Sequence, residues 1–389
     1  MADSVIQFTK PSISDADKQL VLEALDGSLS SDGRFADQCV ARISEILDTP
    51  YVLLTPSCTQ AIELALLVLG LKPGDEVLLP SFTFVSTANA VILHGGTPVF
   101  VEIEEATRNL DPNDLKNKIT PATVGIIPVH YGGNACDMDT ICQIASEAGL
   151  WVVEDAAHAF GARYKGKALG TFGEFGCFSF HSTKNLVCGE GGALVMNRGD
   201  LFHEAEIFRE KGTNRAAFLR NDIDKYTWLR KGSSFLLAEP LAALLCGQLK
   251  RWQEITMERK RIWQLYREGL EPLAQAGLVH LQRISEQNES SWHIFSFLVA
   301  DEATRQALLM HLKRHHIMAS SHFVPLHASP FAREHLGTAP GNLPVTEQVA
   351  ARLVRLPLYC GLSPADTTRI MAAVKGFFSS FGATSLAQR

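Results

Sequence analysis

The sequence predicts an α/β fold, with a mainly parallel sheet sandwiched by helices and a small C-terminal α+β domain after it. Between residues 50 and 200, short apolar runs rich in Val, Ile and Leu alternate with segments of helical period. Runs that are apolar throughout, rather than at every second residue, are typical of strands buried on both faces of a parallel sheet. Beyond residue 200 the pattern of apolar and polar residues changes, which favours a second, smaller domain.

The strands of the first part are short, and each leads into a turn or a helix. They are expected at 51–55, 76–81, 97–103, 124–130, 150–155 and 176–180. The helices between them are expected at 61–70, 85–96, 112 onward and 140–149. Gly70 is expected to close the first of these helices, and Asp111 with Pro112 is expected to open the third as cap and first position.

The second part begins with a helix-periodic span at 239–273, in which Pro240 best fits the first turn. Strands at 292–300 and 317–327, a helix at 304–316 and two terminal helical segments follow. We therefore expect a large domain at 1–240, a long connecting helix at 241–274 and a small domain at 275–389.

Composition excludes several classes of protein. With 36 Lys+Arg against 42 Asp+Glu, the chain has no bulk positive field for a nucleic acid. Eight cysteines without a CxxC pair favour reduced thiols over a disulfide scaffold or a zinc site, and we expect no metal. The first residues lack a signal-peptide pattern, and no apolar run reaches membrane-spanning length. A cytoplasmic protein that does not bind membranes is expected.

Ligands of an open parallel sheet bind at the carboxyl ends of the strands, so the residues that directly follow a strand are the candidates for a binding site. After strand 51–55 come Ser57, Cys58, Thr59 and Gln60, small and hydroxyl residues that open a helix. Free backbone N–H groups and the positive end of the helix dipole could bind a phosphate at this point. The alternative is ordinary helix capping by Ser57 or Thr59.

Two acids, Glu154 and Asp155, follow strand 150–155 at its end. A carboxylate beside an apolar core needs a partner, and a protonated ring nitrogen would be one. The alternative is a salt bridge or a cap to the next segment.

Lys184 lies between strand 176–180 and the Gly-rich turn 189–192. An amine between two buried strands could be partly desolvated, which would lower its pKa and make it a carbonyl nucleophile. The alternative is that the aliphatic part of the Lys184 side chain packs against the protein while its ammonium group reaches water. His158 and His181 could be ligands or bases, although a lone histidine is more often structural.

These parts together satisfy one chemical requirement. Pyridoxal phosphate needs a Schiff-base lysine, a carboxylate at its pyridine nitrogen, an anion cradle and an aromatic plate on its ring. Each of these groups has a candidate in the sequence. The lysine is Lys184, the carboxylate is Asp155, the anion cradle is the start of the helix at Cys58, and the aromatic plate is Phe84. The sequence therefore predicts a pyridoxal-phosphate enzyme.

The motifs resemble those of the DegT/DnrJ/EryC1/StrS family of nucleotide-sugar aminotransferases, which have the fold-type I architecture. The similarity runs from about residue 8 to 378 and is carried by LLTPSCTQAIELA, GDEVLLPSFTFVSTANA, IPVHYGG, VVEDAAHAFGA, CFSFHSTKN, GEGGALV, REKGTNR and HFVPLH. Within the family, PSCT, PSFTFVSTANA, KGTNR, DKYTW and GSSFLL resemble the enzymes that form dTDP-4-amino-4,6-dideoxygalactose, a sugar of surface polysaccharides.

The resemblance implies a role for each site residue. Lys184 would be the Schiff-base lysine and proton shuttle, Asp155 would pair with the pyridinium nitrogen, and Phe84 would stack on the ring. His158 would lie near the phenolic oxygen, where many relatives have glutamine. The remaining residues would hold the phosphate: Ser179 and the amides of Cys58, Thr59 and Gln60.

A second chain is also implied. Many relatives carry a GxNxR-like stretch whose asparagine reaches the phosphate of the neighbouring subunit, and here the run is 232–236. Ser234 could donate that bond, which implies an obligate homodimer. Leu236 stands where the arginine would be, so the carboxylate of the amino donor must be recognised elsewhere.

The implied reaction is a ping-pong transamination from L-glutamate to the C4 ketone of a dTDP-4-keto-6-deoxyhexose. The C4 epimer of the product or a 3-keto-sugar substrate is the alternative. A dehydratase or deoxygenase of the same fold would replace Lys184 by histidine or add a cysteine cluster. A catalytically silent regulator would be expected to lack Lys184 or Asp155, and both are present.

Overall fold

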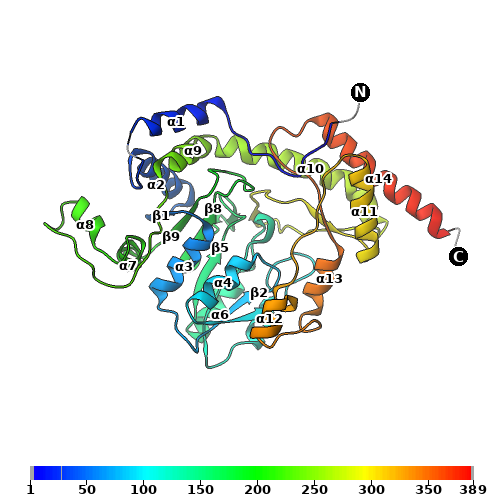
Figure 1. Ribbon diagram of the computed structural model, residues 1–389. Coiled ribbons are helices and arrows are strands. Elements are labelled where there is room, and N and C mark those ends of the chain that lie inside the picture. The colour runs from blue at the N-terminus through cyan, green and yellow to red at the C-terminus, as the bar shows by residue number, and fades with distance from the viewer. Residues whose placement is uncertain (1–3, 28, 387–389) are drawn as a thin grey trace.

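The computed structural model describes residues 4–27 and 29–386, and a seven-stranded sheet lies at its centre (Figure 1). The strands have the order β1-β9-β8-β5-β4-β2-β3. Their bounds are β1 (Tyr51–Thr55), β2 (Glu76–Pro80), β3 (Thr97–Val101), β4 (Thr123–Ile126), β5 (Trp151–Asp155), β8 (Phe175–Ser179) and β9 (Gly192–Met196). Only β9 runs antiparallel to its neighbours, so the expected mainly parallel sheet is confirmed.

Apolar side chains cover both faces of this sheet. On β1, Val52 and Leu54 belong to one buried cluster, whereas Leu53 between them belongs to another. Helices α2 (Arg34–Leu47), α6 (Met138–Ala148) and α9 (Glu239–Lys250) contribute to the first cluster. Helices α3 (Cys58–Leu69), α4 (Val85–Leu93) and α7 (Gly199–Arg209) contribute to the second. Burial on both faces explains why the strands are apolar throughout.

Local signals place the helix ends where the sequence predicts them. Gly70 ends α3 in the left-handed conformation with φ 72°, which glycine adopts without steric cost. Asp111 caps α5 (Pro112–Asn117) by accepting a hydrogen bond from the Asn113 amide. The large part also contains α1 (Asp15–Leu25) and α8 (Arg215–Leu219).

The span expected as one connecting helix is two helices, α9 and α10 (Trp252–Gln275). Arg251 separates them, with φ −109° and ψ 11°. Its guanidinium donates to the buried carboxylate of Asp17 (2.8 Å) and to the Ser12 carbonyl (2.9 Å). These contacts with the N-terminal segment accompany the break, and no Gly or Pro marks it in the sequence.

The C-terminal part has its own core around a second, antiparallel sheet. Strands β10 (His280–Leu281), β12 (Ser296–Leu298) and β13 (Leu353–Arg355) form this sheet. Its helices are α10, α11 (Glu302–Arg314), α12 (Pro330–His335), α13 (Pro344–Arg352) and α14 (Pro364–Leu386). A third sheet, of β6 (Arg163–Tyr164), β7 (Lys167–Ala168) and β11 (Asn288–Glu289), joins the two parts of the chain.

The expected strand at 317–327 is wrong. Ile317 and Ser320 form only isolated bridges, to Ile6 and Arg355. The segment then crosses to the large part, where the Leu326 amide donates to the Ser81 carbonyl (3.1 Å). A chain that crosses between two domains has no neighbouring strand to pair with along its length.

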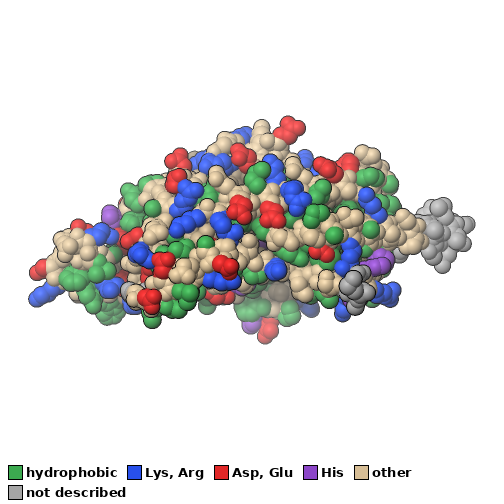
Figure 2. Space-filling view, turned by 90° about the horizontal axis from the view of Figure 1, so that it is seen from above, with side chains coloured by type: hydrophobic (Ala, Val, Ile, Leu, Met, Phe, Trp, Pro, Cys, Tyr) green, Lys and Arg blue, Asp and Glu red, His purple; other side chains and the backbone are tan. Residues whose placement is uncertain are grey.

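Charged side chains of both signs occupy the face of the molecule that is seen in Figure 2. Figure 2 shows basic and acidic side chains interspersed on one face, in keeping with a net charge of −6. Within the described ranges, no helix has both the length and the apolar character that crossing a bilayer requires.

Candidate active site

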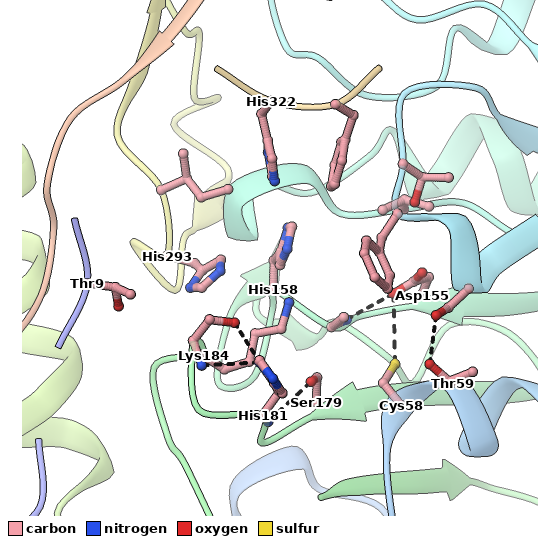
Figure 3. Close-up of a pocket in the computed structure, with 18 of the residues that line it drawn as sticks. Thr9, Cys58, Thr59, Asp155, His158, Ser179, His181, Lys184, His293 and His322 are labelled. Carbon is pink, nitrogen blue, oxygen red and sulfur yellow. Dashed lines mark hydrogen bonds between the residues drawn. The ribbon is translucent and has the colours of Figure 1, made fainter. Parts of the chain in front are cut away.

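A cavity of about 520 Å³ lies at the carboxyl ends of β1, β5 and β8 (Figure 3). The large part contributes the start of α3, the end of β5 and the turn after β8. The C-terminal part contributes His293, His322 and Arg355, and the N-terminal segment contributes Phe8 and Thr9. The site therefore requires both parts of the chain.

The start of α3 presents free backbone donors to this cavity. Ser57 caps the helix by accepting a hydrogen bond from the Gln60 amide (3.1 Å). The amides of Cys58 and Thr59 occupy the first two helical positions, where no intrahelical acceptor exists, and both residues line the cavity. Two of the three predicted amides thus belong to residues that line the cavity and have no intrahelical acceptor, while that of Gln60 serves the cap.

Close packing places this helix against the sheet. A Cβ at Gly192 of β9 would lie 2.4 Å from the carbonyl carbon of Ser57. Glycine at position 192 is therefore needed for α3 to begin where it does.

The two adjacent acids have different environments. Glu154 is fully buried and accepts backbone hydrogen bonds from Gly170 (2.7 Å), Phe172 (2.6 Å) and Gly173 (3.1 Å). It also pairs with His130 at 3.0 Å. Glu154 thus has the structural role that was the alternative for these acids, because its partners are backbone amides and His130.

Asp155 instead faces the cavity. Its carboxylate accepts from the Thr87 hydroxyl (2.7 Å) and the Ala157 amide (3.2 Å). Cys58 Sγ lies 4.0 Å from Oδ1. A carboxylate held in this way can pair with a cation inside the cavity.

Lys184 lies on the turn after β8, whose geometry is fixed by a hydrogen bond from its amide to the His181 carbonyl (2.8 Å). Figure 3 places its side chain in the same hollow as His158 and His293. Burial, with a smaller contribution from the charge of Arg355, lowers the pKa of the amine to about 8 against the opposing effects of Cys58 and Asp155. Because the amine faces the cavity and is buried, the structure favours a nucleophilic role for Lys184 over a side chain whose ammonium reaches water.

Three histidines form one wall of the cavity. The His158 ring lies 4.5 Å from His293 and 6.2 Å from His322, measured between ring centroids. Burial lowers the pKa of each, and nearby cations including Lys184 lower it further, so all three rings are neutral. His158 Nδ1 accepts from the Gly132 amide (3.3 Å), which leaves the ring proton on Nε2.

The remaining predicted residues divide into two groups. Ser179 and Phe84 line the cavity, Ser179 at the end of β8 and Phe84 at the start of α4 with 60% of its surface exposed. Ser234 lies outside the cavity of its own chain, on a segment bridged to Glu210. His181 is near the opening and shares a hydrogen bond with the Thr183 hydroxyl (2.8 Å).

Sequence reasoning missed His293, His322, Arg259 and Arg355, all of which line the cavity. They come from the C-terminal part. His322 opens the motif HFVPLH, which could have drawn attention to it, whereas no local motif distinguishes the other three from structural residues. In the described part of the chain, no group of His, Cys, Asp or Glu is arranged to hold a metal ion.

The donor set fits pyridoxal phosphate. Two free amides beside the Ser179 hydroxyl suit its phosphate, and the Asp155 carboxylate suits a protonated ring nitrogen. A desolvated amine on Lys184 suits its aldehyde, and the ring of Phe84 can cover its face. All of these groups lie around one cavity.

The depressed pKa of Lys184 predicts a pH dependence of cofactor capture. Only the neutral amine attacks a carbonyl, and with a pKa of about 8 its fraction rises until that pH. The capture rate of cofactor-free protein is expected to rise about tenfold per pH unit below the pKa and then level off. Visible absorbance after mixing with pyridoxal phosphate measures this rate. A rate still rising steeply at pH 10 would mean that the amine is solvated.

Comparisons with known proteins identify the family of this chain. The sequence model of the DegT/DnrJ/EryC1/StrS aminotransferase family matches residues 11–375. The spore coat polysaccharide biosynthesis protein SpsC of Bacillus subtilis is 33% identical over 377 residues, which are 95% of this chain and 96% of that protein.

Two solved structures share the whole architecture. DesV of S. venezuelae superposes with a TM-score of 0.87 at 31% identity, covering 96% of this chain and 99% of DesV. The PLP form of Spr1654 from Streptococcus pneumoniae gives a TM-score of 0.89 at 27% identity, covering 97% and 99% of the two chains.

Proposed function

This chain belongs to the DegT/DnrJ/EryC1/StrS aminotransferase family, and we propose that it converts dTDP-4-keto-6-deoxy-D-glucose to dTDP-4-amino-4,6-dideoxy-D-galactose with L-glutamate as amino donor. Family and fold make it a sugar aminotransferase with pyridoxal 5′-phosphate as cofactor. The observation that carries the catalytic part is the desolvated Lys184 amine in one cavity with Asp155.

The choice of sugar rests on sequence. The segments PSCT, PSFTFVSTANA, KGTNR, DKYTW and GSSFLL resemble those of enzymes that make the 4-amino-4,6-dideoxygalactose product. SpsC, by its name, acts in polysaccharide biosynthesis, which supports the same class of product.

Each cavity residue has a distinct task in this proposal. Bound pyridoxal phosphate supplies the electron sink that acidifies the carbon bearing the transferred amine. The amides of Cys58 and Thr59 and the Ser179 hydroxyl bind the phosphate, and Asp155 holds a proton on the ring nitrogen. His158, with its proton on Nε2, donates a hydrogen bond to the phenolic oxygen in the place of the relatives' glutamine.

Lys184 moves the proton. As a neutral amine, Nζ takes a proton from the donor carbon that bears nitrogen and later returns one to C4 of the sugar. The pKa values of the three cavity histidines are lowered, so these rings are neutral and do not compete with Lys184 as cations. The face from which Lys184 delivers the proton decides whether the new amine is axial or equatorial.

A panel of keto-sugars tests the substrate. The holoenzyme is incubated with L-glutamate and either dTDP-4-keto-6-deoxyglucose, its 3-keto isomer or the UDP-linked 4-keto sugar, and 2-oxoglutarate is measured. We expect the dTDP-linked 4-keto sugar to give the highest kcat/KM. A higher value for either of the others would overturn the proposed substrate.

A homodimer completes the site in this proposal. Ser234 lies outside its own cavity, and apolar side chains are exposed at Phe84 (60%), Trp228 (76%) and Leu229 (49%). Exposed apolar groups of this kind favour contact with another chain, from which Ser234 would reach the partner's phosphate. Sedimentation is expected to give twice the chain mass of 42.6 kDa. A monomer with full activity would contradict a shared site.

A cytoplasmic setting is part of the proposal. All eight cysteines are free thiols, as a reducing compartment favours. Cell fractionation should recover the protein with cytoplasmic enzymes, and its recovery with secreted proteins would contradict this placement.

A further inference from the structure

Arg355 of β13 differs from the other shielded arginines of the chain. In the described residues, four arginines have an Nε that neither water nor a hydrogen-bond acceptor reaches: Arg108, Arg251, Arg305 and Arg355. The first three use their terminal nitrogens, on backbone carbonyls or carboxylates. The described part of the chain shows no hydrogen bond and no ion pair for the Arg355 side chain.

Burial lowers the pKa of Arg355, and among the described residues the group that opposes this shift is the Tyr131 phenol rather than a carboxylate. The Phe8 ring lies over its guanidinium at 4.7 Å, and Leu356 and Leu358 line the cavity beside it. The other buried arginine of the cavity, Arg259, is occupied by the carbonyls of Trp292 (3.2 Å) and His293 (2.6 Å).

No carboxylate of the cavity compensates this charge. Asp155 is engaged by Thr87 and Ala157, and Glu190 lies at the opening with 67% of its side chain exposed. The histidines are neutral and Arg259 is occupied by backbone carbonyls, so the charge of Arg355 is left without a carboxylate beside it in the described residues. A shielded cation without a partner is costly, and an anionic ligand would remove that cost.

We propose that Arg355 binds a carboxylate of the amino donor. The proposal rests on the transamination proposed above, in which one cavity must receive an amino acid and then a keto-sugar that has no carboxylate. A guanidinium matches a carboxylate by two parallel N–H···O bonds. Arg355 lines the cavity, and no hydrogen bond or ion pair within the described residues occupies its side chain, so it is free for this task.

The diphosphate of the nucleotide is a poorer match. It carries more oxygens than one guanidinium can satisfy, and Phe8, Leu356 and Leu358 offer no further side-chain donors. The influence of Arg355 on the Lys184 amine also places its charge close to the reacting centre, where the carboxylates of a small amino acid must lie.

The two half-reactions of the holoenzyme separate these roles. In Arg355→Gln, the L-glutamate concentration that half-saturates the single-turnover loss of the visible band is expected to rise about 30-fold or more, as for a broken buried charge pair. Starting from the pyridoxamine form, the half-reaction with dTDP-4-keto-6-deoxyglucose is expected to stay within about threefold of the wild type. Glutarate has the two carboxylates of glutamate but no amine to transfer, and calorimetry with it should show the same loss of affinity.

Matched variants complete the test. Arg352 ends α13, directly before β13. It donates to Val299 O (2.8 Å) and Glu105 (3.0 Å) and does not line the cavity, so Arg352→Gln should leave glutamate saturation unchanged. Arg355→Lys, which keeps the charge, should fall between wild type and Arg355→Gln. An unchanged response of Arg355→Gln to glutamate, or an equal loss in the sugar half-reaction, would overturn the proposal. Because the donor half-reaction is measured alone, a wrong choice of sugar leaves this test intact.

Discussion

Replacement of Lys184 by alanine is expected to abolish transamination, with a loss of about 10⁴-fold or more in kcat. Among the described residues, Lys184 is the one lysine that lines the cavity, and its pKa is lowered to about 8. The variant therefore removes the group that attacks the cofactor and moves the proton. Purified wild-type protein should be yellow, and the variant should lack that covalent absorption band. Steady-state assays and absorbance spectra measure both effects.

Lys116 provides the control for this variant. It is exposed on α5, away from the cavity, so Lys116→Ala should keep the band and the rate. A Lys184→Ala protein that keeps both would mean that another group forms the covalent link, and the assignment would fail.

Asp155→Asn is expected to lower kcat by about 10²–10³-fold while the protein stays folded. Asparagine has nearly the same shape and can still accept from the Thr87 hydroxyl, but it cannot hold a proton on the ring nitrogen as a charged partner does. Rates of both half-reactions and the thermal midpoint should be measured together. The rates should fall with little change in the midpoint.

The neighbouring residue gives the opposite pattern. Glu154 accepts three backbone hydrogen bonds and pairs with His130, so Glu154→Gln is expected to lower the midpoint first. Equal effects of the two substitutions on stability and rate would show that Asp155 is a structural acid like its neighbour.

The pair Glu154–Asp155 also shows how much of the site can be predicted from the sequence. Both acids are predictable as residues at a strand end, because strand 150–155 is apolar and local. Their different fates follow from their partners, since Glu154 is satisfied by amides of residues 170–173 and by His130. Those partners are distant in sequence, so the pattern alone leaves the two acids equivalent.

The same distinction separates the other expectations. The caps at Gly70 and Asp111 depend on neighbouring residues, and the structure has both. The break at Arg251 depends on Asp17 and Ser12, more than two hundred residues earlier, and the sequence gives no sign of it. Arg355 and His322 likewise reach the cavity only because the C-terminal part packs against the large sheet.

The central claim is that Lys184 and its neighbours deliver an amine to C4 of the sugar. The most direct test incubates the holoenzyme with dTDP-4-keto-6-deoxyglucose and ¹⁵N-labelled L-glutamate and determines the product by NMR. We expect ¹⁵N on C4 of the product in the axial, galacto configuration. An equatorial amine, nitrogen at C3 or an unlabelled sugar would contradict it.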